Sequence, residues 1–302
     1  MAATNPLAYS APMAGAGQNG LIGVDGGATT CRFALQQGEK RTVVETAGVN
    51  VTTNPGAAVE TLRDGFAQLA TMAQIAPDAL AEMPAFLGLA GLQTDDAARA
   101  IAAALPLKRA EYAEDRLPAV VGALGARAGS VAAIGTGSFL GRQTDEAVTF
   151  VGGWGLMLGD EASGAWIGRE ILAAALRAED GMMPHTDLTR TVLADLGGPH
   201  GAVAFARDAT PDAYGAEPRV RAVFEAAVAQ DPVATDLLGR GAAYIATALA
   251  ALGHRTTDPL YLMGSVAPEY APYLDPNLTV VRPNGTALDG ALALAARIGR
   301  HG

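Results

Sequence analysis

Hydrophobic and polar residues alternate along the chain with two periodicities, one typical of short strands and one typical of helices. Strand-like runs are expected at 21–24, 31–35 and 41–46, and together they suggest an antiparallel meander. A helix is predicted from Asn54-Pro55, because asparagine caps helices and proline is favoured in their first turn. Its apolar face consists of residues three or four positions apart, namely Val59, Leu62, Phe66, Leu69 and Met72.

The same two periodicities continue to the end of the chain. They predict a buried strand at 85–89, a helix at 95–105, a strand near 109–112 and a helix from 117 to about 128. Strands near 130–134, 138–143 and 148–151 follow, and then several helices. A long helix is expected from Asp231-Pro232 to about Leu252, then a strand at 260–263 and a final helix at 289–298. The order strand, glycine turn, strand in both halves suggests a duplicated α/β architecture without a visible residue repeat.

Composition narrows the class of protein. A chain of 302 residues is long enough for two domains, and its net charge of −10 argues against a nucleic-acid or anionic-membrane surface. Residues 1–20 contain no Lys or Arg, and no apolar run approaches membrane-spanning length, so we expect a soluble, cytoplasmic protein with a disordered extension at 1–20. The only cysteine, Cys31, excludes an internal disulfide and favours an apolar role within a strand.

Two strand-like runs lead into glycine-rich turns that carry hydroxyl groups. The first turn contains Gly26, Gly27, Thr29 and Thr30, and the second contains Gly135, Thr136, Gly137 and Ser138. Small residues let the backbone approach an anion, and successive N–H groups and hydroxyls can surround phosphate oxygens. The pair of turns therefore predicts a clamp on the phosphate tail of a nucleotide.

Two carboxylates stand at predicted strand ends. Asp25 precedes the first glycine turn and could hold the water ligands of a phosphate-bound Mg²⁺, although an ordinary Asp-Gly hairpin is equally compatible. Asp115 could accept the proton of an attacking hydroxyl. Local sequence alone favours a simpler role for Asp115 as a helix N-cap.

The segment 152–167 combines glycines, both tryptophans and an acidic pair. Trp154 and Asp160 are interpreted as a sugar site, because indole rings pack on apolar faces and carboxylates accept hydrogen bonds from hydroxyls. Trp166 and Glu161 are interpreted as core and first-turn residues of the following helix. A structural role is also favoured for His185, which follows a proline in a predicted loop.

These motifs resemble the sugar kinases of the acetate kinase, hexokinase, Hsp70 and actin superfamily. Within it, the chain is similar to the branch that contains N-acetylglucosamine kinases, bacterial glucosamine kinases and the BadF/BadG/BcrA/BcrD ATPases. The phosphate motifs lie at 24–32 and 134–138, and the adenosine motif at 262–267. The segment 153–161 is similar to N-acetylglucosamine kinases, whereas 180–186 and 211–215 are similar to bacterial glucosamine kinases.

The resemblance implies an α/β fold of two RNase H-like (actin/hexokinase-type) domains around a central cleft. The N-terminal domain would span 21–116 and the helix at 287–302, and the nucleotide-binding domain would span 117–286. It also implies that Asp115 is the catalytic base and that Asn50, Asp115, Trp154 and Asp160 bind sugar. Glu114 departs from the family pattern at a position usually held by Asn or Thr, and its charge could raise the pKa of Asp115.

The ATP-binding residues implied by the resemblance lie in the two turns and the adenosine motif. They are Gly26, Gly27, Thr29, Thr30, Gly135, Thr136, Gly137, Ser138, Gly264 and Ser265. ATP and Mg²⁺ are the expected cofactors, with Asp25 holding the metal through water. The expected reaction is transfer of the ATP γ-phosphoryl to the 6-hydroxyl of glucosamine, with N-acetylglucosamine as the alternative sugar.

Two alternatives of the same fold stay open at this point. An ATPase activator of the radical dehydratase type would need cysteines for an iron–sulfur cluster, and Cys31 stands alone. A sugar-sensing module would need a DNA-binding segment, and no basic helix-turn-helix precedes Leu21. The expected partner is a small amino sugar, with no nucleic acid or membrane and with a possible homodimer.

Overall fold

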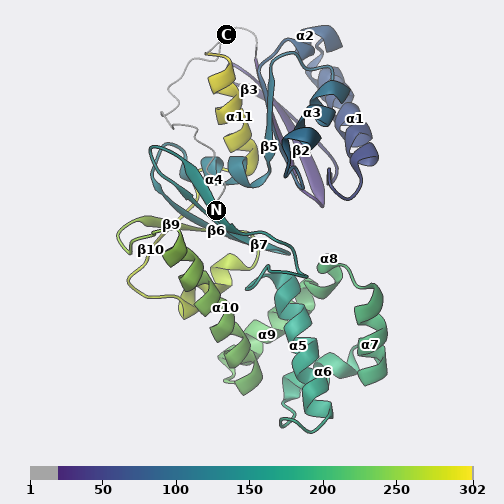
Figure 1. The fold of residues 1–302 in the computed structure, drawn as a ribbon, viewed down its shortest axis with the longest axis vertical. Helices are drawn as coiled ribbons and strands as arrows, with labels where there is room; N and C mark the ends of the chain where they lie inside the picture. The colour runs from purple at the N-terminus through teal and green to yellow at the C-terminus, as the bar shows by residue number, and fades with distance from the viewer. Residues whose placement is uncertain (1–19, 301–302) are drawn as a thin grey trace. The chain divides into compact units, whose positions relative to one another are not determined.

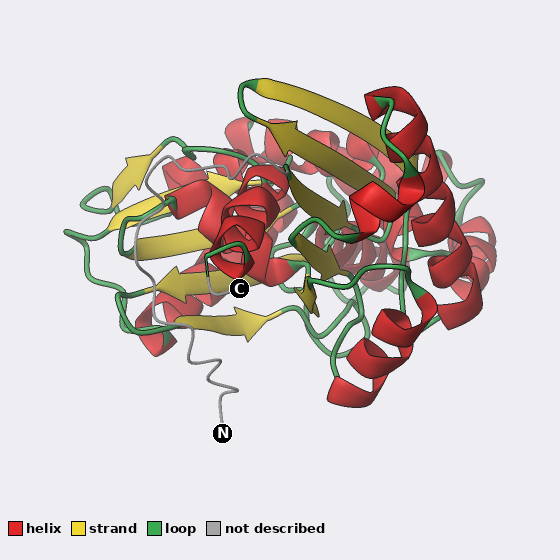
Figure 2. Cartoon of the chain, turned by 90° about the horizontal axis from the view of Figure 1, so that it is seen from above, coloured by secondary structure: helices red, strands yellow, loops and turns green. Residues whose placement is uncertain are grey.

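The computed structural model describes residues 20–300, which form two compact units (Figure 1). Within the described residues, the N-terminal unit comprises 20–128, 143–148 and 283–300, and the C-terminal unit comprises 129–142 and 149–282. In Figure 2 red helices flank the yellow strands of the sheets. The extension expected at 1–20 lies outside the described residues, apart from Gly20.

The N-terminal unit is built on a five-stranded mixed sheet. Its strands are β1 (Leu21–Gly26), β2 (Thr30–Gln37), β3 (Lys40–Ala47), β4 (Ala85–Leu89) and β5 (Ala110–Glu114). They lie in the order β3-β2-β1-β4-β5. The first three strands form the expected antiparallel meander, and β4 and β5 run parallel to β1.

Helices cover both faces of this sheet. They are α1 (Pro55–Ala73), α2 (Pro77–Ala81), α3 (Asp95–Ala104), α4 (Arg116–Leu124) and α11 (Ala287–Ile298). Alternate residues of β2 point to opposite faces: Phe33 packs edge-on against Phe66 of α1, with ring centroids 5.3 Å apart, whereas Ala34 packs against Leu288 and Leu292 of α11. As predicted, Asn54 caps α1 by accepting a hydrogen bond from the Ala57 N–H.

The position of α4 shifts the division of the chain away from the one suggested by the sequence. We expected the second domain to begin at 117, but the structure divides the chain after Ala128. The reason is that α4 packs closely against α11 and belongs to the same unit. The helix also ends at Leu124 rather than near 128, because Gly125 adopts a positive φ of 59°.

The C-terminal unit repeats the strand order of the N-terminal unit. Its strands are β6 (Gly129–Ile134), β7 (Ser138–Gln143), β8 (Val148–Gly152), β9 (Pro259–Met263) and β10 (Thr279–Val281). They lie in the order β10-β9-β6-β7-β8, and β9 is parallel to both β6 and β10. Because β6 and β9 correspond to β1 and β4, the duplicated α/β architecture predicted from the sequence is confirmed.

The helices of the C-terminal unit pack on this sheet and on one another around one large hydrophobic core. They are α5 (Gly164–Glu179), α6 (Asp187–Ala194), α7 (Pro199–Asp208), α8 (Pro211–Tyr214), α9 (Glu217–Val228), α10 (Pro232–Ala251) and the 3₁₀-helix η1 (Ala267–Tyr273). Asp231 caps α10 as predicted, and Gly253 follows its C-terminus with a φ of 69°. None of the helices in residues 20–300 has both the length and the hydropathy needed to cross a membrane.

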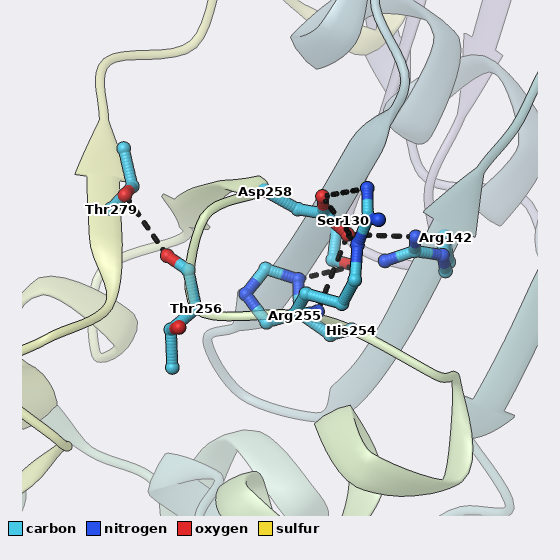
Figure 3. Close-up of polar contacts among 7 residues, drawn as sticks. All are labelled: Ser130, Arg142, His254, Arg255, Thr256, Asp258 and Thr279. Atoms are coloured by element: carbon cyan, nitrogen blue, oxygen red, sulfur yellow. Dashed lines mark hydrogen bonds and ion pairs between the residues drawn. The ribbon is translucent and has the colours of Figure 1, made fainter.

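A polar network around the buried Ser130 and Asp258 fixes the loop between α10 and β9 (Figure 3). Asp258 accepts hydrogen bonds from Arg142 of β7, at 2.8 Å, and from Arg255, which together hold the pKa of its carboxyl well below the usual range. His254 lies 3.0 Å from the Ser130 hydroxyl. This serine–histidine pair resembles a nucleophile and its base, but Ser130 is fully buried and no substrate could reach it. The network therefore stabilises the unit.

Candidate active site

Acidic side chains gather at one edge of the N-terminal sheet. The parallel strands β1, β4 and β5 end together, since the pairing register places Asp25 opposite Gly88 and Gly88 opposite Ala113. Asp115 lies two residues beyond Ala113. Substrates of α/β proteins commonly bind at the carboxyl ends of parallel strands, so this edge is a suitable position for chemistry.

Asp115 occupies the N-cap position of α4 but does not act as a cap. Its carboxylate makes no capping hydrogen bond, so the simpler role favoured by local sequence is wrong. Burial raises the pKa of Asp115, the negative charges of Asp25 and Glu114 add to this effect, and Arg116 opposes it, so that the resulting pKa is about 6. A carboxylate with a pKa close to neutral is well suited to accept a proton from a hydroxyl.

Glu114 is paired with Arg116 across the start of α4. The Arg116 Nε donates a 3.0 Å hydrogen bond to Glu114 Oε2, and Nη2 donates to the same oxygen. Both side chains are mostly buried. Glu114 raises the pKa of Asp115, as the sequence suggested, and Arg116 opposes that effect.

The acid side of the pH profile offers a test of this environment. Below pH about 6, Asp115 takes up a proton and cannot accept another, so kcat should rise as the pH increases through this value. Glu114→Gln removes one cause of the raised pKa and leaves the Arg116 cation, so the rise should move to lower pH. The measurement is kcat against pH at saturating substrates. An unchanged profile would show that the Glu114 charge does not reach Asp115.

Asp25 fits the sort of metal site that a nucleotide requires. Burial raises the pKa of Asp25, while Arg32, 3.9 Å away on β2, lowers it. Residues 20–300 contain no group of three or more His, Cys, Asp and Glu side chains that could form an all-protein metal centre. Phosphate-bound Mg²⁺ needs only one or two carboxylates and retains water, so Asp25 fits such an ion.

Asn50 lies in the loop after β3, close to the same edge. Its Oδ1 accepts hydrogen bonds from the N–H groups of Thr52 and Thr53, both at 3.1 Å. The loop is joined to the strand ends because the Val51 N–H donates to the Ala90 carbonyl. The Asn50 amide nitrogen is therefore the group that can donate to a sugar hydroxyl.

The first glycine turn joins β1 to β2 in the N-terminal unit. Ala28 and Thr29 are exposed at its tip, and the neighbouring loop supports it through a 3.0 Å hydrogen bond from the Val49 N–H to the Gly27 carbonyl. A Cβ at Gly48 would lie 2.1 Å from the Ala28 carbonyl oxygen, so this close approach requires glycine. The exposed tip is compatible with phosphate binding.

The second glycine turn and the adenosine motif lie side by side in the C-terminal unit. The Val266 N–H donates to the Ile134 carbonyl, at 3.0 Å. Gly264 has a φ of 89°, and a Cβ there would lie 2.3 Å from the same oxygen. Two segments about 130 residues apart in the chain thus form one surface.

A cavity of about 410 Å³ opens beside this surface. Gly135, Thr136 and Ser265 line it, together with Val266 of the adenosine motif and Gly215 of the segment 211–215. The other lining residues were missed by sequence reasoning: Glu217, Val220, Arg221, Phe224, Glu225, Val228 and Glu269. Most of the missed residues belong to α9, whose pattern is that of an ordinary amphipathic helix. Val228 is 80% exposed, and it belongs to the cavity rather than to the core. The apolar wall and polar rim fit an adenosine group.

Asp160 lies against the second glycine turn. Its Oδ1 accepts a 3.1 Å hydrogen bond from the Gly155 N–H, and a Cβ at Gly137 would lie 2.9 Å from its Oδ2. The buried Ser138 hydroxyl donates to the Glu161 carbonyl at 2.6 Å, so it holds this loop in place. Asp160 itself has a φ of 58°, a conformation uncommon outside glycine.

The other residues of interest divide into exposed and structural ones. Trp154 is 69% exposed, which leaves its indole available, whereas Trp166 is buried in α5 as predicted. His185 lies 3.1 Å from the Thr189 hydroxyl and 3.4 Å from a Glu179 carboxylate oxygen, in agreement with the structural role predicted for it.

The site residues predicted from the sequence are shared between the units. Those in the N-terminal unit are Asp25, Gly26, Gly27, Thr29, Thr30, Asn50 and Asp115. Those in the C-terminal unit are Gly135, Thr136, Gly137, Ser138, Trp154, Asp160, Gly264 and Ser265. Within each unit the structure brings most of them together. The first unit has the acidic edge with its glycine turn, and the second has the second turn with Asp160 and the adenosine motif.

A duplicated sheet with a glycine turn after the first strand of each copy defines the actin- and hexokinase-like class of fold, in agreement with the predicted α/β architecture. The chain belongs to the BadF/BadG/BcrA/BcrD ATPase family, whose model matches residues 22–278. Membership of this family implies the use of ATP.

Individual relatives extend the comparison. The chain is 31% identical over 286 residues to the glucosamine kinase GspK of Vibrio cholerae, a match that covers 92% of this chain and 96% of that protein. The putative N-acetylglucosamine kinase of Chromobacterium violaceum has a similar structure, with a TM-score of 0.80, 28% identity and coverage of 92% and 99%. A protein of the same description from Porphyromonas gingivalis, 22% identical over 93% of this chain and 100% of its own, shares the fold with a TM-score of 0.64. The expected resemblance to amino-sugar kinases is confirmed.

Proposed function

We propose that the chain transfers the γ-phosphoryl group of ATP to the 6-hydroxyl of glucosamine. The observation that carries the proposal is Asp115, a carboxylate at the end of a strand that caps no helix and whose pKa is raised to about 6. In a family of ATP-using proteins, such a group is suited to activate an acceptor hydroxyl.

In this reaction Asp115 accepts the proton of the 6-hydroxyl through its carboxylate. The sugar oxygen forms a bond to the γ-phosphorus, the bond from that phosphorus to the β,γ-bridging oxygen breaks, and ADP leaves. Asn50 orients the sugar by donating from its amide nitrogen. Mg²⁺, when bound, neutralises charge on the phosphate oxygens, and Asp25 would hold it through water.

The C-terminal unit supplies the adenosine contacts and one set of phosphate contacts in this proposal. Val220, Phe224 and Val228 offer an apolar wall for adenosine, and Ser265 lies at its polar rim. Thr136 and Gly137 would contact the phosphates through backbone N–H groups and the Thr136 hydroxyl. Gly135 would border the phosphates without donating, because its own N–H donates to the Gly137 carbonyl at 2.9 Å. Ser138 acts indirectly, since its hydroxyl is engaged by Glu161. In the N-terminal unit, Gly26, Gly27, Thr29 and Thr30 form the second phosphate contact.

Glucosamine is favoured over its acetylated form by the relative in Vibrio cholerae and by the segments 180–186 and 211–215. An ammonium group also needs an acceptor, which a carboxylate such as that of Asp115 or of Asp160 can provide. N-Acetylglucosamine is the second candidate, because Trp154 is exposed and could pack on an acetyl methyl group. In either case Asp160 and Trp154 would contact the sugar.

A coupled assay of ADP release distinguishes the two sugars. We expect kcat/KM for glucosamine to exceed that for N-acetylglucosamine by about tenfold or more, because an unpaired buried charge or polar group costs about 1–3 kcal/mol. Glucose and mannosamine serve as controls for the amino group and its stereochemistry. A preference for the acetylated sugar would replace the acceptor but keep the mechanism. If none of the sugars in the panel stimulates ADP release, the proposal is refuted.

A further inference from the structure

The segment 211–215 takes no part in the proposed reaction so far, although it lies beside the second glycine turn. It forms α8 and the glycine after it, and it is seated on the first turns of α5. A Cβ at Gly168 would lie 1.9 Å from the Tyr214 carbonyl oxygen, and a Cβ at Gly215 would lie 2.9 Å from the Ala165 nitrogen. Backbone therefore meets backbone here, and α8 has little freedom to shift.

Side chains also hold α8 in place. Arg219 donates hydrogen bonds to the carbonyls of Ala213 and Tyr214, at 2.8 and 3.0 Å. Its guanidinium also lies over the Phe205 ring, 4.9 Å from the centroid. The Thr210 hydroxyl caps the N-terminus of α8 by accepting from the Ala213 N–H. The helix is short, but its position is strongly determined.

This placement directs Asp212 toward the phosphate turn. Its Oδ1 lies 3.0 Å from the Thr136 Oγ1, which donates its proton to the carboxylate. Two acidic residues on the nearby cavity wall differ, since Glu217 and Glu225 both pair with Arg221. In residues 20–300, Asp212 forms no ion pair with a basic side chain, so its charge is not compensated by the protein.

We infer that Asp212 makes the second glycine turn select metal-bound ATP over free ATP, an inference that rests on the proposed binding of ATP at this turn. A threonine hydroxyl has one proton, and phosphate oxygens accept hydrogen bonds but do not donate them. When Thr136 donates to a phosphate, Asp212 loses its donor and is left beside a polyanion. Metal-free ATP meets this repulsion fully, whereas a bound divalent cation reduces it.

The test is nucleotide affinity measured by isothermal titration calorimetry on the full chain, with no sugar present. Asp212→Asn keeps an acceptor for Thr136 but removes the charge. In EDTA, the Kd of this variant for free ATP should fall by about three- to tenfold, a modest range because Asp212 is exposed. In excess Mg²⁺, its Kd should stay within about twofold of the wild-type value.

Asp208→Asn is the matched control, because it makes the same change in net charge nearby at the exposed C-terminus of α7. This control should leave the ratio of the Kd for free ATP to the Kd for ATP in excess Mg²⁺ at the wild-type value. The inference would be overturned if Asp212→Asn had the same ratio as the wild type, or if both variants changed this ratio equally. Failure of the wild-type chain to bind ATP with Mg²⁺ would refute the proposed function and the inference together.

Discussion

Asp115→Asn is expected to lower kcat by about 10²–10⁴-fold, the usual contribution of a positioned general base. Asparagine has the shape of aspartate but cannot accept the proton of the sugar hydroxyl. KM for sugar and ATP should change much less than kcat, because binding contacts other than the carboxylate are kept. The rise in kcat near pH 6 should also disappear, since the group that titrates there is gone. Steady-state kinetics between pH 5 and 8 measures all three effects.

The fold of this variant should be intact, which separates loss of chemistry from loss of structure. The Asp115 carboxylate does not cap α4, and burial disfavours its charged form. An uncharged side chain should therefore leave the Tm unchanged or raise it slightly. Glu114→Gln is the neighbouring control, because it also removes a negative charge and should retain most of kcat at pH 8. Near-normal turnover by Asp115→Asn would refute the assignment of the base.

Local features of the sequence predicted most of the fold because short-range physical chemistry determines them. Asn54 and Asp231 cap the helices that follow, and each makes the hydrogen bond that its position requires. The two glycine turns occur at equivalent points of the duplicated sheet. Short elements were missed: β10 has three residues and α2 has five, too few to show a clear period.

Features that depend on tertiary contacts could not be predicted from one sequence. The cavity wall on α9 has the same apolar spacing as a core-facing helix, so the pattern does not show which face is open. The hydrogen bond between Thr136 and Asp212 joins residues 76 positions apart. Similarly, the sequence placed Asp115 at a helix start, but only the structure shows that its side chain makes no cap.

The close packing of α4 against α11 predicts a large loss of stability when a side chain is added between the two helices. The two helices approach each other most closely at a glycine of each. A Cβ at Gly290 of α11 would lie 1.9 Å from the Pro118 carbonyl oxygen, and a Cβ at Gly122 of α4 would lie 1.9 Å from the Thr286 carbonyl oxygen. The obstructing atoms are backbone, which cannot rotate away as a side chain would. The last helix of the chain is thereby joined to the helix that begins at Asp115, the proposed base.

Gly290→Ala is expected to lower the free energy of unfolding of the N-terminal unit by about 1–3 kcal/mol, the typical cost of overpacking. The sign is informative, because alanine in a helix interior normally stabilises by about 0.5–1 kcal/mol relative to glycine. Gly56→Ala in α1 of the same unit is the control: a Cβ there meets nothing within 4 Å, so this variant should be as stable as wild type or more so. Hydrogen exchange at amides of α4 and α11 resolves the local loss, since the chain has two units that need not unfold together. If Gly290→Ala stabilises the unit as much as Gly56→Ala, the close crossing of α4 and α11 is incorrect.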